Sequence, residues 1–199
     1  DGRVTKEDVQ RAIDDGTASK KEDDTTTPAG EIIPLSGVRR ITAERLSTNW
    51  GVAPHVSEGI EVDFSRFESY RVEREADWLE KWGTALGPND LILAATAQVL
   101  KDHPALNAGY IDGAICRYNE VNLGVAIDIE AGLVVPVVRN ADNLGIGEIA
   151  QRVRELAAKA RDSKLTPDEM EGATFSVSNL GGLGIDWFTP VLNPPQCGI

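Results

Sequence analysis

A sharp change in apolar content near residue 32 divides this chain. Residues 15–31, DGTASKKEDDTTTPAGE, contain almost no apolar side chains and are rich in threonine and charged residues. Such a segment buries too little apolar surface to offset the entropy lost on ordering, so we expect a flexible linker. Residues 1–14 suit one short helix that is too small to fold alone. Residues 32–199 are apolar enough throughout for one globular domain.

Local signals on both sides of this linker predict helices and strands. Thr5 followed by Asp8 has the spacing of a capping box, and Asp112-Gly113 between two apolar runs is a strong hairpin signal. The expected helices cover residues 5–14, 36–50 (capped by Ser36), 65–82, 88–102 and 146–161, and a short one begins near Thr166. The expected strands cover residues 55–64, 108–111, 114–118, 121–129, 133–138 and 173–177. Helices mixed with mainly hairpin-linked strands indicate an α+β or mixed α/β fold, and argue against a doubly wound parallel sheet.

The charge of the chain narrows the class of partner. With 32 acidic residues against 20 basic ones, the formal net charge is −12. This charge argues against binding to a phosphate backbone and leaves no basic stripe for a membrane surface. No apolar run has membrane-spanning length and no signal peptide is visible, so we expect a soluble protein. Cys116 and Cys197 lie in apolar runs, which suits reduced thiols inside a cell.

One stretch near the end, EGATFSVSNLGGLGIDW, can place a small polar side chain at a site. Residues 173–177 alternate as a strand does, and Ser178 follows them directly before a glycine-rich turn. Glycines in such a turn allow positive backbone dihedrals and close approach of another backbone. Ser178 is therefore a candidate functional residue, with a surface turn after an edge strand as the alternative.

Other signals for catalysis are weak. The two histidines, His55 and His103, stand in no triad signature and no metal-ligand spacing, and the cysteines form no CxxC pair. His103 follows a helix, where capping is the simpler role, and packing is the simpler role for His55. The GGLG turn lacks both the GK[ST] ending of a Walker loop and the GxGxxG spacing of a dinucleotide site. The sequence therefore predicts no metal centre and no nucleotide loop.

Several segments, taken in order, resemble one family. They read PLSGVRRITAERL, APHV, IEVDF, HPALNA, NLGVAIDIEAGLVVPVVRNAD and TFSVSNLGGLGIDWFTPVLNPPQ. The set is similar to the catalytic domain of the dihydrolipoamide acyltransferases of 2-oxo acid dehydrogenase complexes, over residues 33–199. GRVTKEDV near the start resembles the end of that family's peripheral subunit-binding domain. The resemblance thus implies a subunit-binding remnant at 1–14, a linker at 15–31 and an acyltransferase domain at 32–199.

The resemblance also implies a fold, a chemistry and partners. The fold would be chloramphenicol-acetyltransferase-like, with a central mixed sheet flanked by helices, in a homotrimer that builds a larger core. An acyl group would be transferred between coenzyme A and the dihydrolipoyl group carried on an upstream domain absent here, and the reaction would use no metal. The partners would be the dehydrogenase and dihydrolipoamide dehydrogenase components, in a bacterial cytoplasm or a mitochondrial matrix.

The family also suggests roles for four residues. Ser178 would donate a hydrogen bond to the tetrahedral oxyanion, a role that suits one preorganised hydroxyl. Asn179, Asp128 and Arg71 match positions that contact coenzyme A, as does Ser178. An exposed helical arginine and an aspartate before a turn also need no ligand, so the matches at Arg71 and Asp128 leave a purely structural role open.

One family motif is missing from the residues given. The family's base is a histidine in HxxxDG, which follows the NPPQ segment, and no HxxxDG occurs here. We therefore expect a chain truncated before its base, inactive by itself, and exposing a face that further elements would cover. The alternative is a non-catalytic structural or subunit-binding component of the same complex. A free small-molecule O-acetyltransferase of related fold is disfavoured by the linker and the subunit-binding remnant.

Overall fold

The contacts of the chain divide it into two units. In the computed structural model, residues 5–14, 31, 33–35 and 37–199 are described. The N-terminal unit is Asp1–Pro34 and the C-terminal unit is Leu35–Ile199. The expected linker lies outside the described residues except for Glu31, and so does the expected cap Ser36.

The N-terminal unit contains helix α1, Lys6–Asp14. Its first turn is held by the capping box that the sequence predicts. The Thr5 hydroxyl and the Thr5 amide both donate to the Asp8 carboxylate, at 2.7 and 2.9 Å, and the Asp8 amide donates back to the Thr5 hydroxyl at 3.3 Å. These bonds satisfy amides that a helix start otherwise leaves unpaired.

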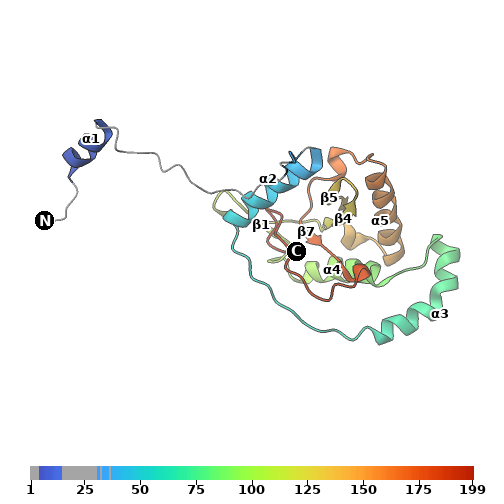
Figure 1. Cartoon of the computed structure of the whole chain (residues 1–199). Coiled ribbons are helices and arrows are strands. Elements are labelled where there is room, and N and C mark those ends of the chain that lie inside the picture. The colour runs from blue at the N-terminus through green and yellow to red at the C-terminus, as the bar shows by residue number, and fades with distance from the viewer. Residues whose placement is uncertain (1–4, 15–30, 32, 36) are drawn as a thin grey trace. The chain divides into compact units, whose positions relative to one another are not determined.

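The C-terminal unit contains the remaining elements (Figure 1). The helices are α2 (Gly37–Val52), α3 (Ser65–Trp82), α4 (Pro88–Asp102) and α5 (Ile146–Arg161), with three short 3₁₀ turns η1 (Ala141–Asn143), η2 (Pro167–Glu169) and η3 (Gly181–Leu183). The strands are β1 (Ala108–Ile111), β2 (Ala114–Arg117), β3 (Leu123–Val125), β4 (Ile127–Ile129), β5 (Gly132–Val134), β6 (Val137–Val138) and β7 (Phe175–Val177). All four expected long helices of this unit are confirmed, within two residues at each end.

A three-stranded mixed sheet lies at the centre of this unit. Its order is β6-β3-β7, with β6 antiparallel and β7 parallel to β3. Helices α4 and α5 pack against each other, and α5 also contacts β4 and β6. The main core joins side chains of α4, α5 and the sheet: Leu93, Ala97, Leu100, Val121, Leu123, Val125, Val138, Ala141, Ile149 and Leu156. Ile149 and Leu156 thus lie on the buried face of α5.

Two hairpins extend the fold. Strands β1 and β2 pair antiparallel around Asp112 and Gly113, which both have positive φ, 50° and 81°. A two-residue turn with positive φ at both positions is the one that Asp-Gly favours, so the expected hairpin is confirmed. Strands β4 and β5 pair antiparallel across the turn at residues 130–131.

The long strands expected over residues 121–129 and 133–138 form one hairpin, but each is split in two. Pro136 has no amide hydrogen and interrupts the ladder between β5 and β6. Its carbonyl still accepts the Val125 amide, at 2.9 Å, so the two chains stay in register. Proline therefore shortens the strands without breaking the hairpin.

The strand expected over residues 55–64 is wrong. These residues run between α2 and α3 and pair with no strand in the described part of the chain. Their alternation suits a strand, but a strand also needs a neighbour to bond its backbone. Without one, Val56 and Ile60 remain 87% and 88% exposed.

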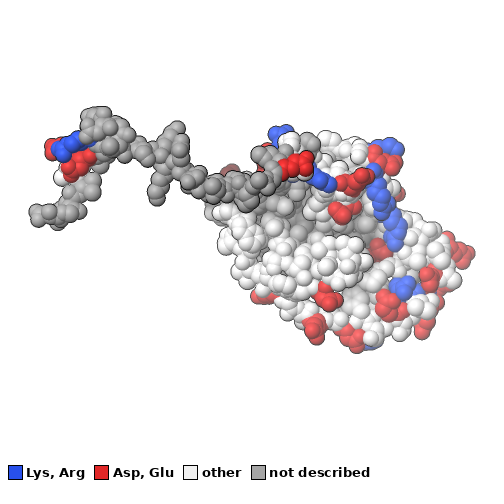
Figure 2. Space-filling view, viewed as in Figure 1, with Lys and Arg blue, Asp and Glu red and all other residues white. Residues whose placement is uncertain are grey.

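Charged and uncharged surfaces are separated on one side of the molecule. Figure 2 shows a face of the C-terminal unit whose middle is uncharged, with most acidic and basic side chains along its border. Cys116 and Cys197 are both free thiols. None of the described helices is long and apolar enough to cross a bilayer.

Candidate active site

Ser178 lies directly after β7, at the end of a parallel pair of strands. Val177 is opposite Val125 of β3, and the Ala126 amide donates to the Val177 carbonyl at 3.0 Å, so the pairing continues up to Ser178. The Ser178 side chain is half-buried, and its hydroxyl makes no hydrogen bond with the residues that the structure describes. A partly shielded hydroxyl with a free proton is suited to donate to a substrate oxygen.

The turn after Ser178 is fixed by Asn179. Its side-chain oxygen accepts the Gly181 amide at 2.8 Å, and its amide group donates to the Asn89 side chain of α4 at 3.3 Å. The first bond closes an Asx turn. Gly184 ends η3 with φ of 73°, a conformation that favours glycine. The glycines therefore shape the turn, and Asn179 attaches it to the start of α4.

The other two residues expected at a coenzyme A site lie on different elements. Asp128 is in the middle of β4, opposite Leu133 and two residues after Ala126, whose amide bonds the Val177 carbonyl. Arg71 is on α3, where its guanidinium contacts the Glu68 carboxylate at 3.0 Å. Asp128 therefore pairs within the β4-β5 hairpin, whereas Arg71 forms an ion pair within its own helix.

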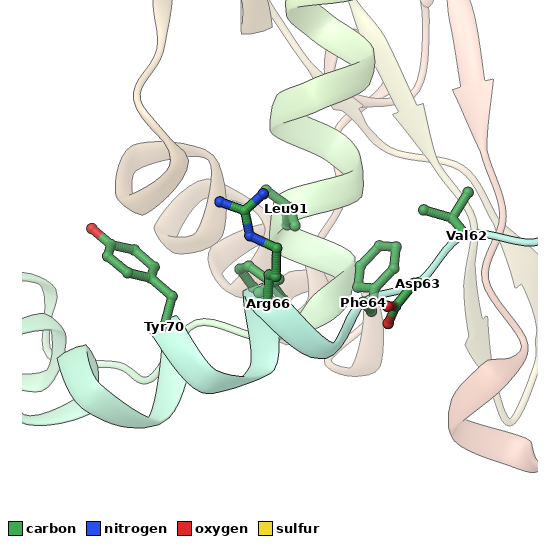
Figure 3. A pocket seen from close by; sticks show the side chains of 7 residues that line it. Val62, Asp63, Phe64, Arg66, Tyr70 and Leu91 are labelled. Carbon is green, nitrogen blue, oxygen red and sulfur yellow. The ribbon is translucent and has the colours of Figure 1, made fainter.

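A cavity of about 550 Å³ opens between the start of α3 and the start of α4. It is lined by Val62, Asp63, Phe64, Arg66, Phe67, Tyr70 and Leu91. In Figure 3 the Arg66 side chain rises from α3 beside Leu91 of α4. Leu91 is two residues after Asn89, so the first turn of α4 borders both this cavity and the Asn179 turn.

The cavity carries charges of both signs. The side-chain and backbone hydrogen bonds from Ser65 lower the pKa of Asp63, with the Ser65 amide at 2.9 Å from the carboxylate. Asp63 is therefore an anion near neutral pH, opposite in sign to Arg66. Sequence reasoning missed Arg66 and Asp63 as site residues, because the cavity forms only where the start of α3 meets Leu91 of α4; the aromatic spacing of residues 64, 67 and 70 was the available signal.

Both histidines have structural roles. Both ring nitrogens of His55 are hydrogen-bonded, to the Ala53 carbonyl and the Leu192 amide. His103 is the C-cap residue of α4, and its amide donates to the Val99 carbonyl at 3.1 Å. The ring contacts of His55 agree with the packing role expected from the sequence, and His103 takes the C-cap position through its backbone. The described residues contain no group of three or more side chains that could hold a metal ion.

Comparison with known proteins gives this geometry a context. The family model for the 2-oxoacid dehydrogenases acyltransferase (catalytic domain) matches residues 27–199. The dihydrolipoyllysine-residue acetyltransferase component of the acetoin cleaving system of Bacillus subtilis is 34% identical over 202 residues, which cover 100% of this chain and 50% of that protein. The chain spans about half the length of this and several other curated relatives.

Solved structures agree in fold. The dihydrolipoamide acetyltransferase of Azotobacter vinelandii, studied for the role of a serine, a histidine and an asparagine in its catalytic mechanism, matches with a TM-score of 0.81 and 37% identity. A structure of the cubic core of the pyruvate dehydrogenase multienzyme complex matches with a TM-score of 0.81 and 36% identity. Each match covers 87% of this chain and 72% of the other. The mixed fold expected from the sequence is therefore confirmed.

Proposed function

The chain belongs to the family of 2-oxoacid dehydrogenase acyltransferase catalytic domains, which matches residues 27–199, and we propose that it forms the core of a dihydrolipoamide acyltransferase. The reaction is transfer of an acyl group between dihydrolipoamide and coenzyme A. Attack of a thiolate on a thioester carbonyl gives a tetrahedral oxyanion, and collapse of this intermediate expels the other thiolate. The family expected from the sequence is confirmed by the match.

The position of the Ser178 hydroxyl is the observation that carries this proposal. The hydroxyl is half-buried, without a partner in the described residues, and fixed between a paired strand and a turn held by Asn179. A donor held in this way needs little reorganisation when charge develops on a substrate oxygen. Ser178 is thus the oxyanion donor rather than the nucleophile, since neither histidine of the chain is placed to activate it.

The residues present fit coenzyme A as a substrate. Phe64, Phe67 and Tyr70 offer ring faces for a planar base, and Arg66 offers a guanidinium for a phosphate. Asn179, beside Ser178, and Asp128 of β4 are proposed contacts of coenzyme A, and Arg71 would bind a phosphate only if its ion pair with Glu68 opened. The acyl group would arrive as a thioester of a lipoyl group attached to another domain, with no metal required.

The base of the reaction has no candidate in these residues. His55 bonds through both ring nitrogens, and no HxxxDG motif occurs. We therefore expect no transfer activity from the 199 residues alone. The second candidate function is a non-catalytic structural or subunit-binding component of a 2-oxo acid dehydrogenase complex.

The assembly proposed is a homotrimer that builds a larger core. Its partners are the dehydrogenase and dihydrolipoamide dehydrogenase components, bound through a domain to which residues 1–14 belong. The compartment is a bacterial cytoplasm or a mitochondrial matrix. The cubic core of the similar pyruvate dehydrogenase complex supports the assembly, and bacterial and mitochondrial relatives support the compartment.

The deciding experiment measures acyl transfer to coenzyme A by the natural protein that contains these residues. Ser178→Ala is expected to lower kcat by about 10²–10³-fold, the cost of one oxyanion donor. Coenzyme A affinity should stay nearly unchanged because the hydroxyl acts on the transition state. Full turnover in Ser178→Ala would refute the oxyanion role. A natural protein without transfer activity that still assembles with the dehydrogenase component would establish the structural role instead.

A further inference from the structure

The hydrogen bonds of His55 define its tautomer. The Leu192 amide donates to His55 Nε2 at 2.9 Å, so Nε2 must carry a lone pair. His55 Nδ1 lies 2.7 Å from the Ala53 carbonyl oxygen, which can only accept, so Nδ1 must carry the proton. Both bonds are possible together only for a neutral imidazole protonated at Nδ1.

The ring is held in place from a third side. Trp50, in the last turn of α2, packs on His55 with ring centroids 4.7 Å apart and an interplanar angle of 30°. Asn49, one residue earlier, donates from its side chain to the Leu192 carbonyl at 3.4 Å. The amide of Leu192 is thus bonded by His55 and its carbonyl by Asn49. Asn49 at the end of α2 and His55 therefore both hold Leu192, which lies in a segment of irregular backbone.

This segment leads back to β7, the strand that directly precedes Ser178. Four residues after Leu192, the buried Gln196 accepts the Ser176 hydroxyl through its side-chain oxygen at 2.7 Å. The Gln196 amide donates to the Asn193 carbonyl at 3.2 Å, which closes a turn between the two contacts. Ser176 is two residues before Ser178 in the same strand direction. The contacts therefore run from α2 through residues 192–196 to β7.

We propose that His55 is a positioning residue, whose neutral Nδ1–H tautomer fixes the Leu192 amide and, through residues 192–196, the strand end at Ser178. The inference rests on the contacts of this chain and does not depend on which reaction the site performs. The two ring nitrogens of His55 make separate bonds, and only the Nε2 bond leads toward the Ser178 segment.

Two substitutions separate these bonds. In His55→Gln the side-chain oxygen occupies the region of Nε2 and can still accept the Leu192 amide. In His55→Asn the shorter amide occupies the region of Nδ1, so the bond to Ala53 can persist while the bond to Leu192 is lost. The two variants are both neutral amides, and each serves as the control for the other.

Amide hydrogen exchange of the 199-residue chain, read by NMR, tests the proposal. The Leu192 amide is expected to exchange about tenfold faster in His55→Asn than in the unsubstituted chain, the size of one lost hydrogen bond, and at nearly the original rate in His55→Gln. The Ser178 amide resonance should shift in the Asn variant and return in the Gln variant. Equal protection of the Leu192 amide in all three proteins would show that His55 does not hold this amide. An unshifted Ser178 resonance in the Asn variant would show that the effect of His55 does not extend to Ser178.

A measurement on the unsubstituted chain covers the case in which a variant does not fold. The ¹⁵N resonances of the His55 ring report which nitrogen bears the proton. A protonated Nδ1 with a hydrogen-bonded, unprotonated Nε2 is the expected pattern. A proton on Nε2 would contradict the proposal directly, because the Leu192 amide and Nε2 would then both be donors and could not bond.

Discussion

Two nearby serines, Ser176 in β7 and Ser178 directly after it, show how position decides the role of a hydroxyl. Ser176 is buried, and its hydroxyl donates to Gln196, so its proton is used within the fold. Ser178, two residues later, is half-buried and keeps its proton free. The same side chain therefore stabilises the structure at one position and is available to a substrate at the other.

Substituting each serine by alanine should separate stability from activity. Ser176→Ala leaves the buried Gln196 oxygen without its donor, and we expect a loss of about 1–3 kcal/mol in the free energy of unfolding. Ser178→Ala removes no bond, so its stability should stay within about 0.5 kcal/mol of the original. Urea unfolding monitored by tryptophan fluorescence measures both. Equal losses in the two variants would contradict the assigned roles.

Glu169 gives the fold a defined sensitivity to acid. The Lys159 ammonium, 2.6 Å away, is the main cause that lowers the pKa of Glu169, and bonds from Thr166 act in the same direction. A carboxyl group with a lowered pKa in the fold stabilises the protein above its ordinary pKa, near about 4.3, and this contribution is lost as the pH falls through the folded value. The bonds tie η2 to α5.

We therefore expect the acid side of the stability profile to depend on this residue. Thermal unfolding of the unsubstituted chain should show a drop in Tm between about pH 5 and pH 3, and Glu169→Gln should show a smaller drop. At neutral pH the variant should be the less stable of the two, since it lacks the ion pair. Parallel profiles of the two proteins over the whole range would show that Glu169 is not responsible.

At the scale of elements, α3 and α5 meet through a contact that allows only glycine. Gly147 is buried in the first turn of α5, and a methyl group there would overlap the indole ring of Trp82 at the end of α3. Gln151, one turn later, donates to the Trp82 carbonyl at 2.9 Å. The aromatic end of α3 is thus held close to the backbone of α5.

Gly147→Ala should destabilise the fold by about 1–3 kcal/mol, because overpacking must displace Trp82. The control is Gly51→Ala in α2, where an added methyl group meets nothing within 4 Å. Alanine is the better helix former, so this control should be neutral or stabilising by up to about 1 kcal/mol. Chemical unfolding of both variants checks the pair, and a stable Gly147→Ala protein would show that Trp82 has room to move.

Substitutions at Arg66 and Asp63, which line the cavity between α3 and α4, should have opposite effects on coenzyme A binding. Removing the cation with Arg66→Ala should weaken binding, and removing the anion with Asp63→Asn should strengthen it, each by about three- to tenfold for a partly exposed charge near a phosphate. Isothermal titration with coenzyme A measures both affinities. Titration with pantetheine, which lacks the phosphates of coenzyme A, tests whether the two charges act on a phosphate. If both variants bind as the original does, coenzyme A does not enter this cavity.

The elements that the sequence predicted well are those whose signals are local. The capping box at Thr5 and the Asp112-Gly113 turn specify their structures through residues three positions apart or fewer, and both appear as expected. The strand at 55–64 failed because pairing depends on a distant partner that periodicity does not describe. The cavity residue Arg66 was missed for the same reason, since its neighbour Leu91 comes from another helix.

At the scale of the whole molecule, the C-terminal unit exposes apolar side chains from two distant segments that lie together. A side chain added at Gly59 would be 3.8 Å from the Trp187 indole nitrogen, so the 55–64 segment contacts the segment after η3. Ile60, Leu183 and Trp187 are 88%, 73% and 69% exposed. Monomeric proteins rarely leave such side chains together in water, so this surface is suited to association between copies.

We expect the chain to associate at micromolar concentration, with the trimer as the species that the family resemblance implies. Introducing charge into this surface with Ile60→Glu and Trp187→Glu together should shift the chain to a monomer, because each buried carboxylate would lose its hydration without gaining a partner. Val72→Glu, on the 63% exposed Val72 of α3 and outside these two segments, is the control and should leave association unchanged. Sedimentation velocity over a range of concentrations measures all three proteins. If the unsubstituted chain is a monomer at every concentration, this surface is not an interface between copies. Equal dissociation of the Val72→Glu control would show that added charge acts through general repulsion in a chain of net charge −12, and not through this surface.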